Sequence, residues 1–337
     1  MLPIFRARDA IRADMKEYFD RLENRIANLE SKNDYLFFCL QHLDGETDLE
    51  TKKRVFRSLP KASGRVADFQ FASNYILSRV KRICDENGIN FALCGGTLLG
   101  AVRHEGFIPW DDDVDLDILR EDFYRLEELL ANDEELVMKR YYKYMFDGKE
   151  AGYIPRIKLR ASDSFFVDIF PMDFMTVEPG KEAAAQQEKE ALCREFSEKL
   201  RRVFENHGLF YTGNRRAEAH PELDADVIAL EKEYLAKYQE RFVREGHLTH
   251  FTRAVGNDSW LRDIYHLQKL EDFLPFERDA VVFEGKRYST FKNYDRLLRY
   301  QYGDYWALPH VVEQKHESEF AVYSASDAKL LEALRKR

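Results

Sequence analysis

Few cysteines, no long apolar run and no excess of basic residues limit what this chain of 337 residues can be. Cys39, Cys84, Cys94 and Cys193 are scattered without a C-x-x-C pair, which excludes a disulfide framework and a thiolate zinc site. No stretch approaches the length of a membrane span. The opening MLPIFRARDAIR becomes charged before the apolar run of a signal peptide could form. We therefore expect a soluble protein of the reducing cytoplasm.

The charge balance is acidic, with 52 basic and 61 acidic side chains, a net charge of −9 and a pI near 5.6. This balance argues against a general nucleic-acid binder, whose affinity depends on basic surface meeting phosphate. Hydrophobic residues make up 45% of the chain and aromatic residues 14%. The chain can therefore build a main domain with a substantial core and an accessory part.

The N-terminal segment has a series of mostly apolar residues that recur at alternating intervals of four and three positions. The series is Met15, Phe19, Leu22, Ile26, Leu29, Asn33, Leu36, Leu40 and Leu43. This heptad spacing predicts a coiled coil that joins two copies of the chain through residues 15–43, although a helix packed on its own domain has a similar stripe. Asn33 at an a position favours a parallel homodimer, and Arg25 and Glu30 can pair between chains.

The remaining pattern predicts an α+β fold, a mixed β-sheet flanked by helices, because strands and helices follow one another irregularly. The expected strands are 89–94, 113–118, 135–142, 152–160 and 164–170, the last stopped by Pro171, and a hairpin turns at Glu284-Gly285. Expected helices include one with Ala72, Ile76, Val80 and Ile83 on one stripe, closed by Gly88, one over 97–106 and one over 120–131. The predicted parts are a coiled-coil helix (1–45), a polar linker (46–68), a main domain (69–310) with a charged helical insertion (181–246), and a C-terminal helical tail (311–337).

The stretch GFIPWDDDVDLDI (106–118) sets five aspartates among apolar residues. In a strand, Asp113, Asp115 and Asp117 share one face while the intervening side chains enter the core. Two carboxylates about 4 Å apart repel by roughly 4 kcal/mol at an effective dielectric of 20, so the site needs a proton or a cation. Oxygen ligands without Cys or His predict Mg²⁺ or Mn²⁺.

The acidic stretch has three other possible interpretations. An EF-hand loop that starts at Asp113 would need Gly at 118 and Glu at 124, where the chain has Ile118 and Tyr124. A solvated acidic edge strand is disfavoured by the apolar flanks. The D-x-D of a glycosyltransferase that binds a nucleotide sugar through Mn²⁺ fits the residues as well.

Upstream, ALCGGTLLGAVR (92–103) predicts a strand, a glycine pair and a helix whose first backbone N–H groups can bind phosphate. A glycine pair alone is more often a simple turn. Followed by D-x-D in the next strand and by Asp168 in a later one, it indicates a phosphate site beside a metal site.

These motifs resemble the LicD family, the bacterial phosphotransferases related to fukutin-related protein within the nucleotidyltransferase superfamily. The matching blocks are GGTLLGAVRHEGFIPWDDDVDLDI (95–118), VDIFPMD (167–173) and NYDRLLRYQYGDYWALP (293–309), within residues 70–310. The resemblance implies a nucleotidyltransferase-type catalytic domain. It also implies transfer of a phosphorylated alcohol, best known as phosphocholine from CDP-choline, to a hydroxyl of a cell-surface glycan (lipopolysaccharide, teichoic acid or capsule), with release of CMP. The acceptor would be lipid-linked at the inner face of the membrane.

The resemblance assigns roles to individual residues. Asp113, Asp115 and Asp168 would bind the metal and carry catalysis, with Asp168 also accepting the proton of the attacking hydroxyl. The nucleotide and phosphate would contact Gly95, Gly96, Thr97, Arg103 and Lys158. Asp111 matches a further acidic position, whereas Asp117 departs from the family pattern and receives no primary role.

Several assignments stay open on sequence alone. The basic candidates, which also include His104 and Arg156, can equally form surface salt bridges. Aromatic rings that could hold a quaternary ammonium, or could simply be core, are Trp110, Tyr294, Tyr302, Tyr305 and Trp306. Competing functions are transfer from a CDP-polyol (ribitol or glycerol phosphate), transfer from a nucleotide sugar, and a non-enzymatic coiled-coil scaffold.

Overall fold

The computed structural model describes residues 40–145, 150–210, 221–253, 267–307 and 323–336, with scattered positions between 15 and 37. The chain divides into two units. One holds Met1–Leu59 with Trp306–Val312, and the other holds Pro60–Tyr305 with Glu313–Arg337.

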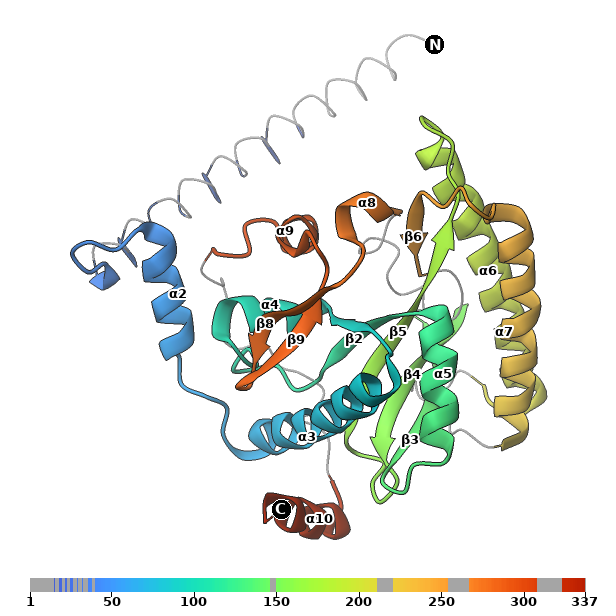
Figure 1. Cartoon of the computed structure of the whole chain (residues 1–337), viewed down its shortest axis with the longest axis horizontal. Helices are drawn as coiled ribbons and strands as arrows, with labels where there is room; N and C mark the ends of the chain where they lie inside the picture. Colours follow the sequence, from blue (N-terminus) through green and yellow to red (C-terminus); the bar gives the residue numbers. More distant parts are fainter. Residues whose placement is uncertain are drawn as a thin grey trace. The chain divides into compact units, whose positions relative to one another are not determined.

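The larger unit is built on one mixed sheet. Its main strands lie in the order β1 (Phe91–Leu93), β2 (Asp115–Leu119), β5 (Phe166–Met175), β4 (Glu150–Leu159) and β3 (Leu136–Met145). Strands β2 and β5 run parallel, and the other neighbours run antiparallel. The far half of β5 also pairs with β6 (His250–Thr252), which pairs with β7 (Gln268–Lys269) (Figure 1). The sheet and its helices confirm the predicted α+β class.

Strand β5 runs through Pro171, so the prediction that this strand stops there was wrong. Its pairing with β4 ends at Asp168 and its pairing with β6 begins at Asp173. Between these two ladders β5 is paired with β2 alone. Proline, which has no N–H to donate, is tolerated where a strand is bonded on one side only.

The helices beside the glycine pair and the acids follow their apolar patterns. Helix α3 (Gly64–Asn87) buries Ala72, Ile76 and Val80 of its predicted stripe, with Cys84 buried in place of the half-buried Ile83. It ends at Gly88, whose φ of 64° suits glycine. Helix α4 (Gly95–His104) begins at the glycine pair itself. Helix α5 (Arg120–Ala131) has the predicted bounds, and its Phe123, Leu126 and Leu130 are fully buried.

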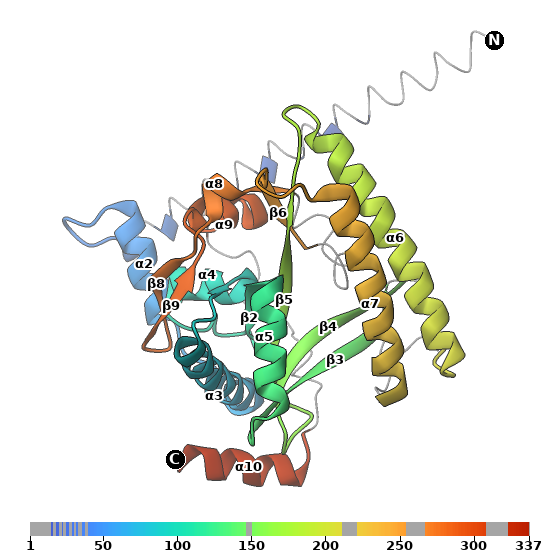
Figure 2. The same cartoon turned by 45° about the vertical axis from the view of Figure 1, so that its right-hand side comes forward.

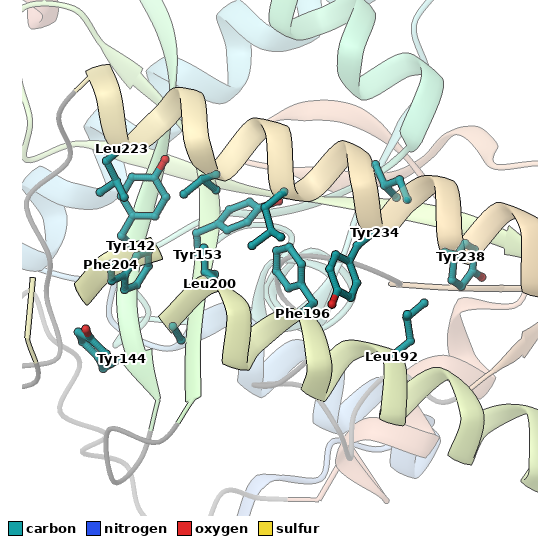
Figure 3. Packing of buried hydrophobic residues seen from close by; sticks show 14 of the residues in the cluster. Tyr142, Tyr144, Tyr153, Leu192, Phe196, Leu200, Phe204, Leu223, Tyr234 and Tyr238 are labelled. Atoms are coloured by element: carbon teal, nitrogen blue, oxygen red, sulfur yellow. The ribbon is translucent and has the colours of Figure 1, made fainter. Parts of the chain in front are cut away.

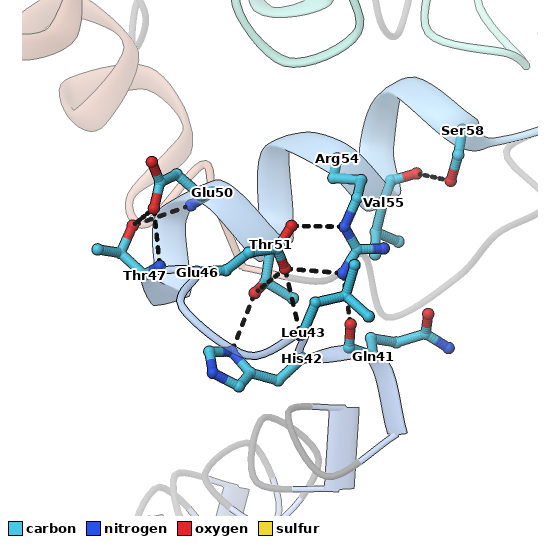
Figure 4. A network of polar contacts seen from close by, with 10 residues as sticks. All are labelled: Gln41, His42, Leu43, Glu46, Thr47, Glu50, Thr51, Arg54, Val55 and Ser58. Carbon is cyan, nitrogen blue, oxygen red and sulfur yellow. Dashed lines mark hydrogen bonds and ion pairs between the residues drawn. The ribbon is translucent and has the colours of Figure 1, made fainter.

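The polar stretch expected as a linker contains helix α2 (Asp48–Ser58) and the first turn of α3. Capping marks the start of α2: the Glu50 N–H donates to the Thr47 hydroxyl (3.3 Å), and the Thr47 N–H donates to the Glu50 carboxylate (2.7 Å). Arg54 pairs with Glu46 at 2.7 Å in the same network (Figure 4). Apolar periodicity missed α2 because Phe56 is its one buried large apolar side chain.

The charged segment 181–246 forms α6 (Glu182–Asn206) and α7 (Pro221–Phe242), which lie side by side against β3 and β4 (Figure 2). The contact surface is rich in aromatic rings (Figure 3). It includes Tyr142 and Tyr153 from the sheet, Phe196 and Phe204 from α6, and Tyr234 from α7. The segment is therefore packed on the sheet through a core of its own.

A buried ion network also ties α7 to the sheet. Glu231 of α7 accepts from Arg120 (3.2 Å) and from Arg140 (3.3 Å). Arg120 also pairs with Asp173 of β5 at 2.7 Å, and Arg140 pairs with Glu127 of α5 at 2.9 Å. Each buried charge has an opposite partner, as burial requires.

The C-terminal part begins with α8 (Leu270–Phe273) and the hairpin of β8 (Glu277–Phe283) and β9 (Lys286–Thr290). The predicted turn is confirmed, with φ of 46° at Glu284 and 75° at Gly285. Helices α9 (Tyr294–Tyr302) and α10 (Ala325–Arg335) follow, the latter within the predicted tail.

Of the residues named for the predicted coiled coil, Glu30 and Asn33 lie outside the described residues. The described positions between 15 and 41 are helical, and Leu29, Leu36 and Leu40 are 65%, 58% and 77% exposed. Among the helices of the described part, none has the length and apolar character that crossing a bilayer requires.

Candidate active site

The parallel pairing of β2 with β5 brings two acids side by side. Asp115 and Asp168 are direct partners in this register, which a hydrogen bond from the Asp168 N–H to the Val114 carbonyl (2.8 Å) supports. Carboxylate oxygens of Asp113, Asp115 and Asp168 lie within 4.8 Å of one another. An all-oxygen set of this spacing suits one hard cation such as Mg²⁺ or Mn²⁺.

Two further acids continue the cluster upstream. Oxygens of Asp111, Asp112 and Asp113 also lie within 4.8 Å of one another. Their loop is held by a turn from the Asp111 N–H to the Ile108 carbonyl (2.9 Å) and by the Gln70 amide of α3, which donates to the Asp111 carbonyl (2.7 Å). Sequence reasoning missed Gln70, because a polar residue on a helix gives no sign of a distant partner.

The glycine pair touches the acids directly. A Cβ atom on Gly95, whose φ is 54°, would lie 2.8 Å from Asp115 Oδ2, and one on Gly96 would lie 2.8 Å from Asp111 Oδ2. Only residues without a side chain fit at this distance. The N-terminal end of α4 and the carboxylates therefore form one site.

Thr97 supports the acids from the same turn of α4. Its hydroxyl, 2% exposed, accepts a hydrogen bond from the Asp115 N–H at 2.8 Å. Thr97 was expected to contact nucleotide or phosphate. The structure shows its hydroxyl bound to the backbone N–H of Asp115, and contact of Thr97 with phosphate stays a prediction.

The electrostatics of the cluster favour a cation. Burial first, and then the charges of Asp115, Asp111 and Asp168, raise the pKa of Asp113 well above its ordinary value. Burial, Asp168 and Asp111 raise the pKa of Asp115 in the same way, while Arg253 opposes the shift. A divalent cation between these groups would favour their ionised forms.

Among the predicted cations, Arg156 reaches an acid of the site. Its Nε donates to Asp168 Oδ1 at 2.7 Å and its Nη2 to Asp168 Oδ2 at 3.4 Å. Lys158 donates instead to the Asp163 carbonyl at 2.6 Å, and burial lowers its pKa. Arg103, whose pKa burial lowers to about 10, donates to the Tyr305 carbonyl at 3.1 Å. The role of Lys158 and Arg103 in binding nucleotide or phosphate stays a prediction.

Asp117 belongs to a buried ion pair behind the site. Arg253, which follows β6, donates from Nε to Asp117 Oδ1 at 3.0 Å and again from Nη2. The Asp117 side chain is 0% exposed, and the guanidinium lies 3.9 Å from the centre of the Phe170 ring. The pKa of Asp117 lies above its ordinary value, because burial raises it by more than the contact with Arg253 lowers it. Sequence reasoning missed Arg253, which pairs across a long sequence separation.

The five candidate aromatic residues do not share one environment. Tyr305 and Trp306 are 4% and 8% exposed, and Trp306 packs with Phe56 in the smaller unit. Trp110 and Tyr294 are half-buried. Tyr302 of α9 is 43% exposed, and partial desolvation together with the charges of Asp115, Asp111 and Asp113 raises its pKa. Tyr302 is thus the candidate with an electrostatic link to the acids.

Alanine at Gly95 should weaken Mn²⁺ binding and lower the free energy of unfolding by about 1–3 kcal/mol. The added Cβ would need a positive φ and would displace Asp115 Oδ2. Gly208→Ala is a matched control, because φ there is 74° with no atom within 4 Å of the added Cβ. Titration with Mn²⁺ and urea unfolding measure both effects. Equal losses of unfolding free energy and equal Mn²⁺ affinity in Gly95→Ala and Gly208→Ala would contradict the close approach of Gly95 to Asp115.

Comparison with known proteins identifies relatives of this arrangement. The model of the LicD/FKTN/FKRP nucleotidyltransferase domain matches residues 88–203, which include the glycine pair and all the acids described above. Lipopolysaccharide cholinephosphotransferase LicD of Haemophilus influenzae is 27% identical over 256 residues, or 71% of this chain and 91% of that protein.

Two further relatives match shorter segments of the chain. Ribitol 5-phosphate transferase FKRP of Homo sapiens is 34% identical over 89 residues, 26% of this chain and 18% of that protein. Uncharacterized protein RP689 of Rickettsia prowazekii is 41% identical over 61 residues, 18% of this chain and 23% of that protein. The chain thus spans most of the bacterial transferase and less than a quarter of the other two relatives.

Proposed function

We propose that this chain, which contains a domain of the LicD/FKTN/FKRP family and is homologous to transferases of phosphorylated alcohols, transfers such a group to a hydroxyl of a cell-surface glycan. The first candidate is phosphocholine from CDP-choline, because the relative with the longest shared segment among those described above is a lipopolysaccharide cholinephosphotransferase. The observation that carries the proposal is the convergence of Asp113, Asp115 and Asp168 beside the glycine pair.

A nucleotidyltransferase-type site suits this chemistry. Asp113, Asp115 and Asp168 would hold the divalent ion. When bound, the ion supplies charge neutralisation for the donor pyrophosphate and for the departing CMP. The backbone N–H groups at the start of α4 would donate to phosphate oxygens, aided by the helix dipole. Because Gly96 touches Asp111 and Gly95 touches Asp115, phosphate and ion would be neighbours.

Removal of the proton from the attacking hydroxyl needs an acceptor, and sequence suggested Asp168. The guanidinium of Arg156 donates to both oxygens of Asp168. Each carboxylate oxygen has a second lone pair, so Asp168 keeps both proposed roles, binding of the ion and acceptance of this proton.

A donor screen tests the proposal. Purified protein is incubated with Mg²⁺ or Mn²⁺ and with CDP-choline, CDP-ribitol, CDP-glycerol or a UDP-sugar, and nucleotide release is followed. We expect release of CMP from a CDP-alcohol, and none from the Asp115→Asn control. Turnover of the UDP-sugar alone would establish the glycosyltransferase alternative, and no turnover or donor binding at all would favour a scaffold.

We also propose that residues 15–43 join two copies of the chain. The described apolar side chains Leu29, Leu36 and Leu40 are more than half exposed, and their spacing continues the heptad pattern.

Deleting residues 1–45 should therefore reduce a dimer to a monomer in sedimentation velocity, because the whole seam is removed. Binding of Mg²⁺ should persist, since its candidate ligands lie in the larger unit. An unchanged oligomer after truncation would refute the seam.

A further inference from the structure

Three residues on adjacent strands form a row across the sheet. Arg156 of β4 is the direct partner of Asp168 of β5, and Asp168 is the direct partner of Asp115 of β2. Direct partners place their side chains on the same face. Arg156 is therefore the next group in line behind the candidate ion ligands.

The guanidinium of Arg156 is fixed from both faces. Its central carbon lies 3.9 Å from the centre of the Tyr141 ring and 3.7 Å from that of the Phe166 ring. Two rings this close cannot occupy the same face of one planar group, so they enclose it. The side chain is 13% exposed, and its fork meets the carboxylate of Asp168 with two N–H groups.

We propose that Arg156 is a positioning residue: it fixes the carboxylate of Asp168 so that this group meets Asp113 and Asp115 at a single cation position. This inference rests on the proposed metal-dependent function. Partners that orient ligand carboxylates typically contribute 10–100-fold to metal affinity. The enclosing rings and the two-point contact supply that orientation here.

Two effects of opposite sign act when Arg156 is replaced. Loss of a positive charge beside the acids strengthens cation binding by Coulomb's law. Loss of orientation frees Asp168 to turn away, and this weakens binding. The direction of the change in affinity therefore separates a positioning residue from a mere counter-charge.

The test is Mn²⁺ binding, followed by electron paramagnetic resonance on the full chain without donor. Arg156→Gln should weaken binding by about 10–100-fold. Arg156→Lys keeps the charge but has no fork, so it should weaken binding as well. Arg125→Gln makes the same substitution in an ion pair with Asp122, where Arg125 is 52% exposed; it is the control and should bind like wild type.

Wild-type or tighter Mn²⁺ binding by Arg156→Gln would overturn the inference, as would full affinity in Arg156→Lys. Absence of Mn²⁺ binding by the wild type would also overturn it. If Arg156→Gln does not fold, by circular dichroism, Arg156→Lys carries the test. Binding needs no donor, so failure of the donor screen with intact Mn²⁺ binding would count against the proposed function alone.

Discussion

Asparagine in place of Asp115 should slow donor turnover by about a thousandfold or more while the protein stays folded. Asp115 joins both halves of the site, as the direct partner of Asp168 and the neighbour of Gly95. A divalent ion contributes several kcal/mol to phosphoryl transfer, and each ~1.4 kcal/mol is a factor of ten in rate. CMP release at saturating Mg²⁺ measures the loss, and circular dichroism checks the fold. Turnover near the wild-type rate in this variant would show that the proposed metal site does not take part in the reaction.

Asp113→Asn tests the same cluster through stability. The pKa of Asp113 lies well above its ordinary value because of burial and neighbouring acids, so its ionised form destabilises the metal-free fold at neutral pH. As pH falls through the raised pKa, the wild-type carboxyl takes up a proton and this cost disappears. The variant should therefore melt at a higher temperature than wild type at pH 8, with a smaller difference at pH 5. A pH-independent difference would contradict this electrostatic account.

Methionine in place of Arg253 should lower the free energy of unfolding by about 3–5 kcal/mol, the range for breaking one side of a buried ion pair. Asp117 is 0% exposed, and its Oδ1 accepts from two nitrogens of Arg253. Methionine preserves apolar contact with Phe170 but leaves the carboxylate without its cation. Urea unfolding followed by circular dichroism measures the effect.

Two controls isolate the pair in that experiment. The double variant Asp117→Leu with Arg253→Met removes both charges and should recover much of the lost stability. Lys336→Met breaks an exposed ion pair, in which Lys336 is 72% and Glu332 69% exposed. It should lower the free energy of unfolding by less than about 1 kcal/mol. A loss in Arg253→Met as small as in Lys336→Met would show that the buried pair is not structural.

Much of the fold could be predicted because local patterns determine it. The stripe of α3, the bounds of α5 and the Glu284-Gly285 turn are consequences of periodicity and turn chemistry within one segment. Helix α2 was missed because its start is marked by capping and its buried face is small. Pro171 misled the prediction because its tolerance in β5 depends on where other strands end.

Some residues of the candidate site could be predicted from local patterns, whereas others depend on contacts between distant segments. Alternation along a strand placed Asp113 and Asp115 on one face, and the pattern of motifs added Asp168. Sequence reasoning preferred Lys158 to Arg156 as a basic group of the site, although both lie on the same strand face. The choice between them depends on β5, whose register sets Arg156 beside Asp168, and on the turn that offers the Asp163 carbonyl to Lys158. Gln70 and Arg253 reach Asp111 and Asp117 from distant segments of the chain, and no local sequence pattern identifies them.

The parallel pairing of β2 with β5 has a consequence for synthesis of the protein on the ribosome. Between these strands the chain makes α5, β3 and β4 before it returns to lie beside β2. A nascent chain that ends before Phe166 holds Asp113 and Asp115 but has no Asp168 to complete the set. Non-local pairing of this kind is slow to form, so the three acids come together only after β5 has been made and has paired with β2.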